Sequence, residues 1–246
     1  MPIICTTRRK EVAAMTNKGR FKEIFTSQIN RPGAVDLMAW LESTDFFTAP
    51  ASTKYHGAFP GGLVGHSLNV YYELISRKNA GTAESRAICA LLHDICKANY
   101  YEPQDGGGYQ VNDRFPFGHG EKSVFLIARF MRLTDEEALA IRWHMGAYDD
   151  AARGGSRTLS AAMAVSPLVY ELHAADMRAT QQEQRKESGG GLICAVCGKP
   201  VERVKPCGYE RWHGQVTCDD CCEECFRSEP FPCRDHDERM KEKLEE

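Results

Sequence analysis

The stretch Ala90-Leu91-Leu92-His93-Asp94-Ile95-Cys96-Lys97 decides the fold of this chain. It is an apolar helical run that ends in an imidazole beside a carboxylate, two metal ligands that follow a segment expected to be buried. Two adjacent side chains do not surround a cation, so the other ligands must come from other helices. Five residues in apolar, helix-like neighbourhoods are candidates for this role: His56, His66, His119, His144 and Asp176.

Hydrophobic periodicity predicts helices around these candidates. The apolar residues between 63 and 74 keep a period near 3.6 residues, and His66 lies on their side, so we expect it to point inward. Thr134 opens a capping box, which predicts that a helix follows it and ends near Gly146. We therefore expect His144 to lie in the last turn of that helix.

Further helices are expected from the same kind of pattern. The stretch 34–43 is one, with Val35 in its candidate buried face, and His119 opens another, whose apolar face includes Phe125. Pro167 follows a serine that can cap a helix, so it predicts the start of a third. Strand signals are few, and the predicted fold class of the larger domain is all-α.

Together these side chains are suited to bind two divalent ions. A first ion is expected at four residues: His66, His93, Asp94 and Asp176. His119 and His144 would hold a second ion, with Asp94 as the bridge. Two such ions activate water and neutralise phosphate charge, so metal-assisted phosphoryl hydrolysis fits, with Asp94 as a catalytic candidate. Lys97, one turn after His93, is the other, because its ammonium can pair with a phosphate oxygen.

Four motifs carry a family resemblance: 61–67 around His66, His93-Asp94-Ile95-Cys96-Lys97, 118–123 around His119, and Ala175-Asp176. They resemble the HD phosphohydrolase superfamily over roughly residues 34–180, and His119 with His144 is similar to the additional pair of its binuclear members. The stretch 56–66 is similar to a branch that contains a bacterial 3′-to-5′ exoribonuclease. Cys96 departs from the glycine that many members have there. The resemblance implies an α-helical HD-domain bundle with one or two ions of Mn, Mg, Fe or Ni.

The expected substrate is a phosphomonoester or phosphodiester in a nucleotide or oligonucleotide. His56 and Lys122 are the candidate substrate contacts, and the long loop 98–118 is expected to act as a lid. Two alternatives are left open: a nucleotide-sensing binding protein with a degenerate site, and a di-iron oxygenase on the same scaffold. His173, three residues before Asp176, is an alternative to that aspartate near the metal.

Eight of the eleven cysteines crowd into the last part of the chain, where pairs spaced by two residues are typical of zinc sites. The candidate ligands of one or two structural zinc ions are Cys194, Cys197, Cys207, Cys218, Cys221, Cys222, Cys225, Cys233 and His236. Their partition between ions is open. We expect metal to supply the folding energy of this module, which would contact protein or nucleic acid.

Composition limits the remaining choices. The 246 residues are 42% hydrophobic and 26% charged, which is typical of globular proteins, and the net charge of -3 provides no bulk reason for nucleic-acid binding. No apolar run is long enough to span a membrane, so a cytoplasmic protein without membrane contact is expected. We divide the chain into a segment 1–33, an HD domain 34–182, a linker 183–191 and a zinc-binding module with a charged tail, 192–246.

Overall fold

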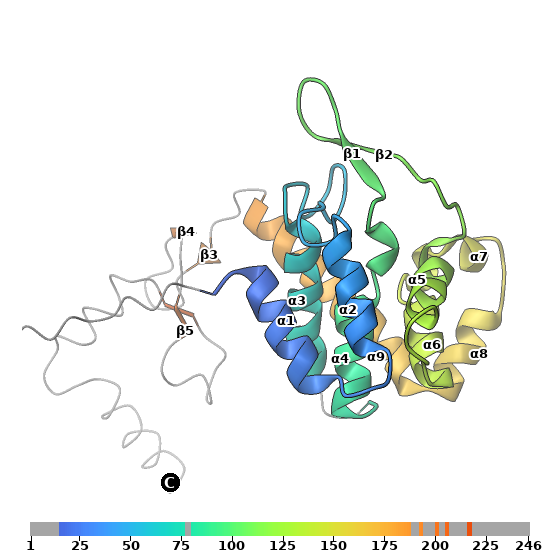
Figure 1. Ribbon diagram of the computed structural model, residues 1–246. Coiled ribbons are helices and arrows are strands. Elements are labelled where there is room, and N and C mark those ends of the chain that lie inside the picture. The colour runs from blue at the N-terminus through green and yellow to red at the C-terminus, as the bar shows by residue number, and fades with distance from the viewer. Residues whose placement is uncertain are drawn as a thin grey trace, which may run out of the picture. The chain divides into compact units, whose positions relative to one another are not determined.

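The computed structural model describes residues 15–76 and 80–187, together with four two-residue strand segments further along the chain. The chain divides into two compact units, Met1–Glu183 and Gln184–Glu246. The described part of the first unit is mostly helical, as the sequence predicted (Figure 1). No helix among the described residues is long and apolar enough to cross a lipid bilayer.

Nine α-helices lie in the described residues: α1 (Asn17–Gln28), α2 (Ala34–Ser43), α3 (Gly62–Ile75), α4 (Ala83–Leu92), α5 (His119–Ala128), α6 (Asp135–Arg142), α7 (Asp150–Arg153), α8 (Thr158–Val165) and α9 (Pro167–Glu187). Two short 3-10 helices follow α4 and α6: η1 (Ile95–Lys97) and η2 (Gly146–Tyr148). The antiparallel strand pairs are β1 (Tyr101–Pro103) with β2 (Tyr109–Val111), β3 (Leu192–Ile193) with β4 (Pro200–Val201), and β5 (Lys205–Pro206) with β6 (Val216–Thr217).

Helices α3 and α4 pack against each other in the core of the first unit, and α1 lies against both (Figure 1). Leu63 and Leu74 of α3 and Leu91 and Leu92 of α4 are fully buried. Burial of side chains of this size contributes about 1.5–3 kcal/mol each, so these helices form a firm support. The stretch that ends in His93 is therefore fixed where α4 meets the rest of the core.

Helix α1 belongs to this core rather than to a separate terminal segment. Phe21, Ile24 and Phe25 follow one another at helical spacing and are all buried. Thr16 begins the helix, because its side-chain oxygen accepts a hydrogen bond from the amide of Gly19 at 3.1 Å. The compact helical unit therefore includes α1, which precedes the predicted boundary at residue 34.

Helix α2 has the predicted bounds, but one residue of its predicted buried face points to solvent. Leu37, Met38 and Leu41 are buried, whereas 82% of Val35 is exposed. Each residue turns the helix by about 100°, so Val35 lies about 200° from Leu37 and on the opposite side.

Helix α6 begins as predicted and ends earlier. Thr134 and Glu137 exchange the two hydrogen bonds of a capping box at 2.9 and 3.3 Å. The last helical residue is Arg142, because Trp143 adopts a φ of -108° and a ψ of 14°. His144 consequently lies beyond the helix and not in its last turn.

The loop 98–118 contains the hairpin β1–β2, which projects from the helices in Figure 1. Its turn is made by Gly106, Gly107 and Gly108, which all have positive φ angles that other residues rarely adopt. The action of this loop as a lid stays a prediction.

Helix α9 extends further than the sequence predicted. Ser166 precedes it and accepts a hydrogen bond from the amide of Leu168 at 3.3 Å, as expected for a capping serine. The helix then continues to Glu187, so the first residues of the predicted linker 183–191 are its last turns. The predicted zinc ligands from Cys194 to His236 all lie outside the described residues.

Candidate metal centre

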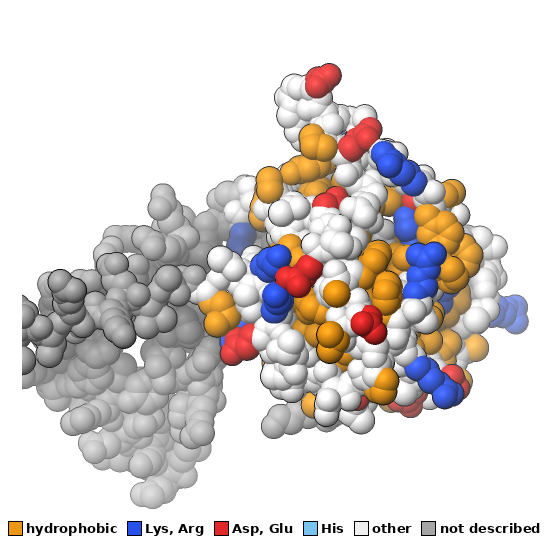
Figure 2. Space-filling model, viewed as in Figure 1, with side chains coloured by type: hydrophobic (Ala, Val, Ile, Leu, Met, Phe, Trp, Pro, Cys, Tyr) orange, Lys and Arg blue, Asp and Glu red, His pale blue; other side chains and the backbone are white. Residues whose placement is uncertain are grey.

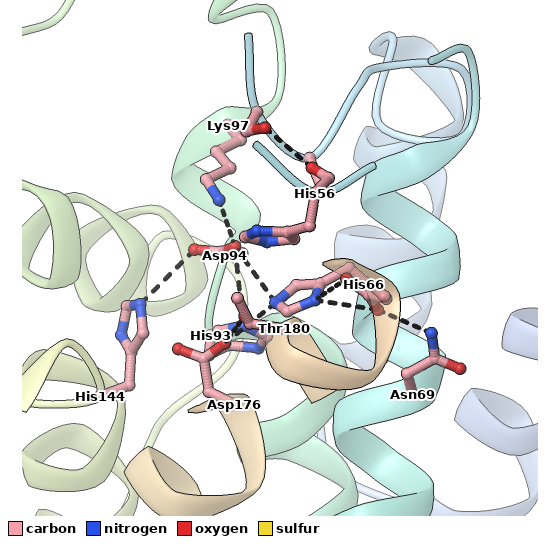
Figure 3. A network of polar contacts seen from close by, with 12 residues as sticks. His56, His66, Asn69, His93, Asp94, Lys97, His144, Asp176 and Thr180 are labelled. Carbon is pink, nitrogen blue, oxygen red and sulfur yellow. Dashed lines mark hydrogen bonds and ion pairs between the residues drawn. The ribbon is translucent and has the colours of Figure 1, made fainter. Parts of the chain in front are cut away.

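Four of the predicted ligands converge from three helices (Figure 3). His66 comes from α3, His93 and Asp94 from the end of α4, and Asp176 from α9. The Nε2 atom of His66 lies 3.1 Å from Oδ1 of Asp176 and 3.9 Å from Oδ2 of Asp94. His93 Nε2 lies 3.6 Å from the same Oδ2 atom. These separations let one cation contact several of the four side chains.

The two remaining histidines approach the other oxygen of Asp94. His119, the first residue of α5, has its Nε2 atom 2.9 Å from Asp94 Oδ1, and His144 Nε2 lies 3.5 Å from that oxygen. Figure 3 shows Asp94 between His144 on one side and Lys97 and His66 on the other. One carboxylate thus faces two separate groups of imidazoles, one with each oxygen.

Two buried histidines are oriented so that their outer nitrogens, which lie near Asp94, form no hydrogen bond. Nδ1 of His93 lies 2.9 Å from the carbonyl oxygen of Ala90, and Nδ1 of His144 lies 2.7 Å from that of Ile141. A carbonyl only accepts, so each Nδ1 donates, and each neutral ring presents an unprotonated Nε2 atom. Both Nε2 atoms are buried and have no hydrogen-bond partner.

These unpaired nitrogens test whether a metal ion fits the site. A buried polar atom without a partner costs about 1–3 kcal/mol, so an unsatisfied pair inside one cluster needs a compensating ligand. A neutral imidazole nitrogen beside a carboxylate is a favourable donor to a divalent ion. The donor atoms therefore fit a metal ion in three overlapping groups: His66 with His93 and Asp176, His93 with Asp94 and His144, and Asp94 with Cys96 and His119.

Glu183 supports the first group from the outer side of His66. Its Oε2 atom lies 3.0 Å from His66 Nδ1, and its Oε1 atom accepts a hydrogen bond from Asn69 at 2.6 Å. A carboxylate on the far nitrogen of a ligating histidine fixes the ring and increases its basicity. Sequence reasoning missed Glu183 because it lies in a polar stretch. The available signal was its position two turns after Asp176 on the same helix.

Burial and neighbouring charges shift the pKa values of His93 and His66 in opposite directions. Burial lowers the pKa of His93 to about 4, so its ring is neutral at pH 7. Burial also acts to lower the pKa of His66, but the hydrogen bonds to Asp176 and Glu183 outweigh it and raise this pKa to about 10. For Asp94, burial is opposed mainly by the charge of Lys97, and its pKa lies well below the usual range.

Lys97 and His56 line the same centre. The ammonium group of Lys97 lies 2.6 Å from Asp94 Oδ2, and this carboxylate raises the pKa of Lys97 against the effect of burial. The ring of His56 lies 4.8 Å from that of His66, and both of its nitrogens are buried without a partner. Burial lowers the pKa of His56 to about 4, so the ring is neutral and available for a contact.

Two other predicted residues lie outside the cluster. Lys122 forms an ion pair of 2.7 Å with Asp113 and does not reach the His/Asp group. His173 donates from Nδ1 to the carbonyl oxygen of His144 at 2.7 Å, so it supports that loop, while Asp176 occupies the ligand position. Cys96, by contrast, lies 3.4 Å from Nδ1 of His119, a contact that the sequence did not predict.

No protein-family model matches this sequence, and no curated protein and no solved structure matches it either. The geometry of the centre's own residues is therefore the observation that bears on its role. That geometry places all six predicted metal ligands in one connected group.

Proposed function

We propose that this protein is a metal-dependent phosphohydrolase of the HD type. It would cleave a phosphomonoester or phosphodiester, in a nucleotide or nucleic acid, by attack of water on phosphorus. The observation that supports the proposal most is the position of Asp94, whose two oxygens face two different imidazole groups. When ions are bound, a carboxylate in this position would contribute to both ligand groups.

The side chains of the chain have distinct tasks in this reaction. His66, His93 and Asp176 form one ligand group, and His119 and His144 form the other, on either side of Asp94. Divalent ions, when bound, supply activation of water and neutralisation of phosphate charge. Glu183 holds the ring of His66 in the orientation that directs Nε2 into the centre.

Lys97 and His56 provide the contacts to the substrate. The Lys97 ammonium, beside Asp94, is placed to pair with a non-bridging phosphate oxygen and to orient the ester. His56 is a neutral ring with free nitrogens, so it can donate a hydrogen bond to the same phosphate group. The cysteines between 194 and 233, with His236, are proposed separately to bind structural zinc.

The test compares Asp94→Asn with the wild-type protein. We expect Mn²⁺-dependent release of nitrophenol from bis(p-nitrophenyl) phosphate or p-nitrophenyl phosphate to fall at least about 10³-fold, because several kcal/mol of transition-state stabilisation is lost. Elemental analysis should show loss of the ions of the His/Asp cluster and retention of zinc. The exposed Asp36→Asn is the matched control and should change neither property.

Two outcomes would contradict the proposal. The first is full hydrolysis by Asp94→Asn, which would place the chemistry elsewhere. The second is a wild-type protein that binds Mn²⁺ but cleaves neither ester. Oxygen consumption without phosphate release would indicate oxygenase chemistry instead.

A further inference from the structure

Three phenylalanine rings gather on the surface around α5, the helix that His119 opens. Phe115 and Phe117 precede α5 and stack with ring centroids 5.2 Å apart at an angle of 8°, and Phe125 of α5 lies 5.2 Å from Phe117. Their exposed fractions are 38%, 48% and 38%. Phe125, which the sequence placed on the apolar face of this helix, is thus partly exposed. Connected exposed rings of this size mark a binding surface. We call Phe115, Phe117 and Phe125 the aromatic cluster.

Positive charge without a protein partner borders the aromatic cluster. The guanidinium of Arg129 lies 5.0 Å from the ring centre of Phe125, and Arg114 precedes the loop phenylalanines. Neither arginine forms an ion pair within residues 15–76 and 80–187, whereas the nearby Lys122 is paired with Asp113. Figure 2 shows Lys and Arg side chains next to hydrophobic ones over the region of α5. The surface thus combines exposed rings with cations that an anionic ligand can neutralise.

The loop that carries two of the rings is held in place before any ligand binds. The carboxylate oxygen Oδ1 of Asp113 accepts a hydrogen bond from the amide of Phe115 at 3.0 Å and one from Lys122 at 2.7 Å. Pro116, with its fixed φ angle, separates the two stacked rings. The rings therefore form a prepared platform, which reduces the entropy lost on binding.

A cavity of about 610 Å³ opens next to this platform. Its lining includes Trp40, Asn99, Tyr101, Arg114, Phe115 and Arg129. Asn99 lies two residues after Lys97, and Phe117 lies two residues before His119, so the cavity and the aromatic cluster both adjoin the centre along the chain.

The acidic groups of the cavity are already engaged by the protein. Asp45 accepts a hydrogen bond from the amide of Asn99 at 2.6 Å, and Glu102 accepts one from the side chain of Asn112 at 2.6 Å. Their oxygens are thus partly satisfied, while the guanidinium group of Arg114 is not. Neutral amide donors leave both carboxylates charged, so the positive charge open to a phosphate is that of Arg114 and Arg129.

We propose that the aromatic cluster, with Arg114 and Arg129, binds the bases and phosphates of a single-stranded nucleic acid whose scissile phosphate lies at the metal centre. The inference rests on the proposed function and names its substrate class. Stacking of unpaired bases on exposed rings, with arginines along the phosphates, is the usual mode of sequence-tolerant single-strand binding. A mononucleotide would leave most of the platform uncovered.

The test measures binding of fluorescein-labelled 12-mers of oligo(dT) and oligo(U) to the full chain by fluorescence anisotropy. No Mn²⁺ is added, so that cleavage does not compete. Arg114→Ala with Arg129→Ala should weaken binding and reduce the slope of log K against log salt by about 1.4, because two phosphate contacts are lost. Phe117→Ala should weaken binding about 5- to 150-fold with an unchanged slope, because stacking carries no charge.

The control removes the same charge elsewhere. Lys18→Ala with Lys22→Ala changes α1, which lies on the opposite side of the unit from α5 in Figure 1, and should leave affinity and slope unchanged. Equal affinities for the wild-type protein and both surface variants would overturn the inference. Hydrolysis of bis(p-nitrophenyl) phosphate without any oligonucleotide binding would overturn it as well, and would leave the proposed function intact. Binding without hydrolysis would support the surface and contradict the proposed function.

Discussion

Two buried charged clusters of this protein differ in how completely their polar atoms are paired. Around Glu137, both carboxylate oxygens accept hydrogen bonds from Arg31, at 2.6 and 3.0 Å, and one accepts a further bond from the amide of Thr134. In the metal centre, His93 and His144 each keep a buried Nε2 atom without a partner. The first cluster is complete as it stands, whereas the second has donor atoms that a ligand could use. This difference separates a structural ion pair from a candidate site.

The largest expected effect comes from removing one of the unpaired nitrogens. His144→Gln should lower kcat/KM for the cleaved nitrophenyl ester by about 10²–10³-fold and reduce bound Mn²⁺ by one ion, because the second ligand group loses a member. Steady-state kinetics and elemental analysis provide the measurement. The exposed Glu136→Gln is the control, since that side chain lies outside the ligand group. Equal losses of kcat/KM and bound Mn²⁺ in both variants would contradict the assignment of His144 as a metal ligand.

Changes in the ion pair of Arg31 and Glu137 should alter the stability of the protein and leave its metal content unchanged. Arg31→Met leaves Glu137 buried with its charge poorly paired, so the free energy of unfolding should fall by about 3 kcal/mol in urea. The double variant Arg31→Met with Glu137→Met should lose less than the single one, because both charges are gone. If Arg31→Met is as stable as the wild-type protein, the ion pair has no structural role. If Arg31→Met loses Mn²⁺, the ion pair and the metal centre are not independent.

A smaller effect is expected from Glu183, which contacts the first ligand group only through His66. Glu183→Gln should weaken Mn²⁺ binding about 10- to 100-fold by isothermal titration calorimetry, because His66 loses the charge that orients it. The exposed Glu136→Gln is the control for the change in net charge. If Glu183→Gln binds Mn²⁺ as tightly as the wild-type protein, the charge of Glu183 does not support the metal centre.

The smallest expected effect is the loss, in acid, of the stability that the ion pair of Arg31 and Glu137 provides. Burial alone would raise the pKa of Glu137, but the hydrogen bonds from Arg31 and Thr134 outweigh it and lower this pKa below its ordinary value of about 4.5. The stabilisation is thus fully present above about pH 4.5 and is lost as the pH falls through the lowered, folded-state pKa.

Glu137→Gln removes this titration. Urea unfolding at a series of pH values, with metal removed, should show the variant less stable at neutral pH by about 1–2 kcal/mol, with a difference that shrinks in acid. A difference that is constant with pH would contradict the assignment of charge to Glu137.

The sequence predicted the features that depend on local pattern. The capping box at Thr134, the bounds of α2 and the inward direction of His66 all follow from periodicity or from cap chemistry, and the structure confirms them. The convergence of six ligands was predicted from residue type and from resemblance. The structure brings these side chains into overlapping groups, and their binding of metal stays a prediction.

The failures concern features that depend on tertiary neighbours. Phe125 has helical spacing with core residues, yet it stacks with loop phenylalanines that no local rule connects to it. Glu183 lies in a polar stretch that a linker would also have, and only its contact with His66 reveals its role. The early end of α6 puts His144 in a loop, and its direction is set by the carbonyl of Ile141.

The most direct test of the metal centre is an anomalous diffraction measurement at the manganese edge on crystals grown with Mn²⁺. We predict two peaks that share Asp94, one in contact with His66, His93 and Asp176 and one in contact with His119 and His144. Manganese bound only elsewhere, with the Nε2 atoms of His93 and His144 still unpaired, would contradict this account.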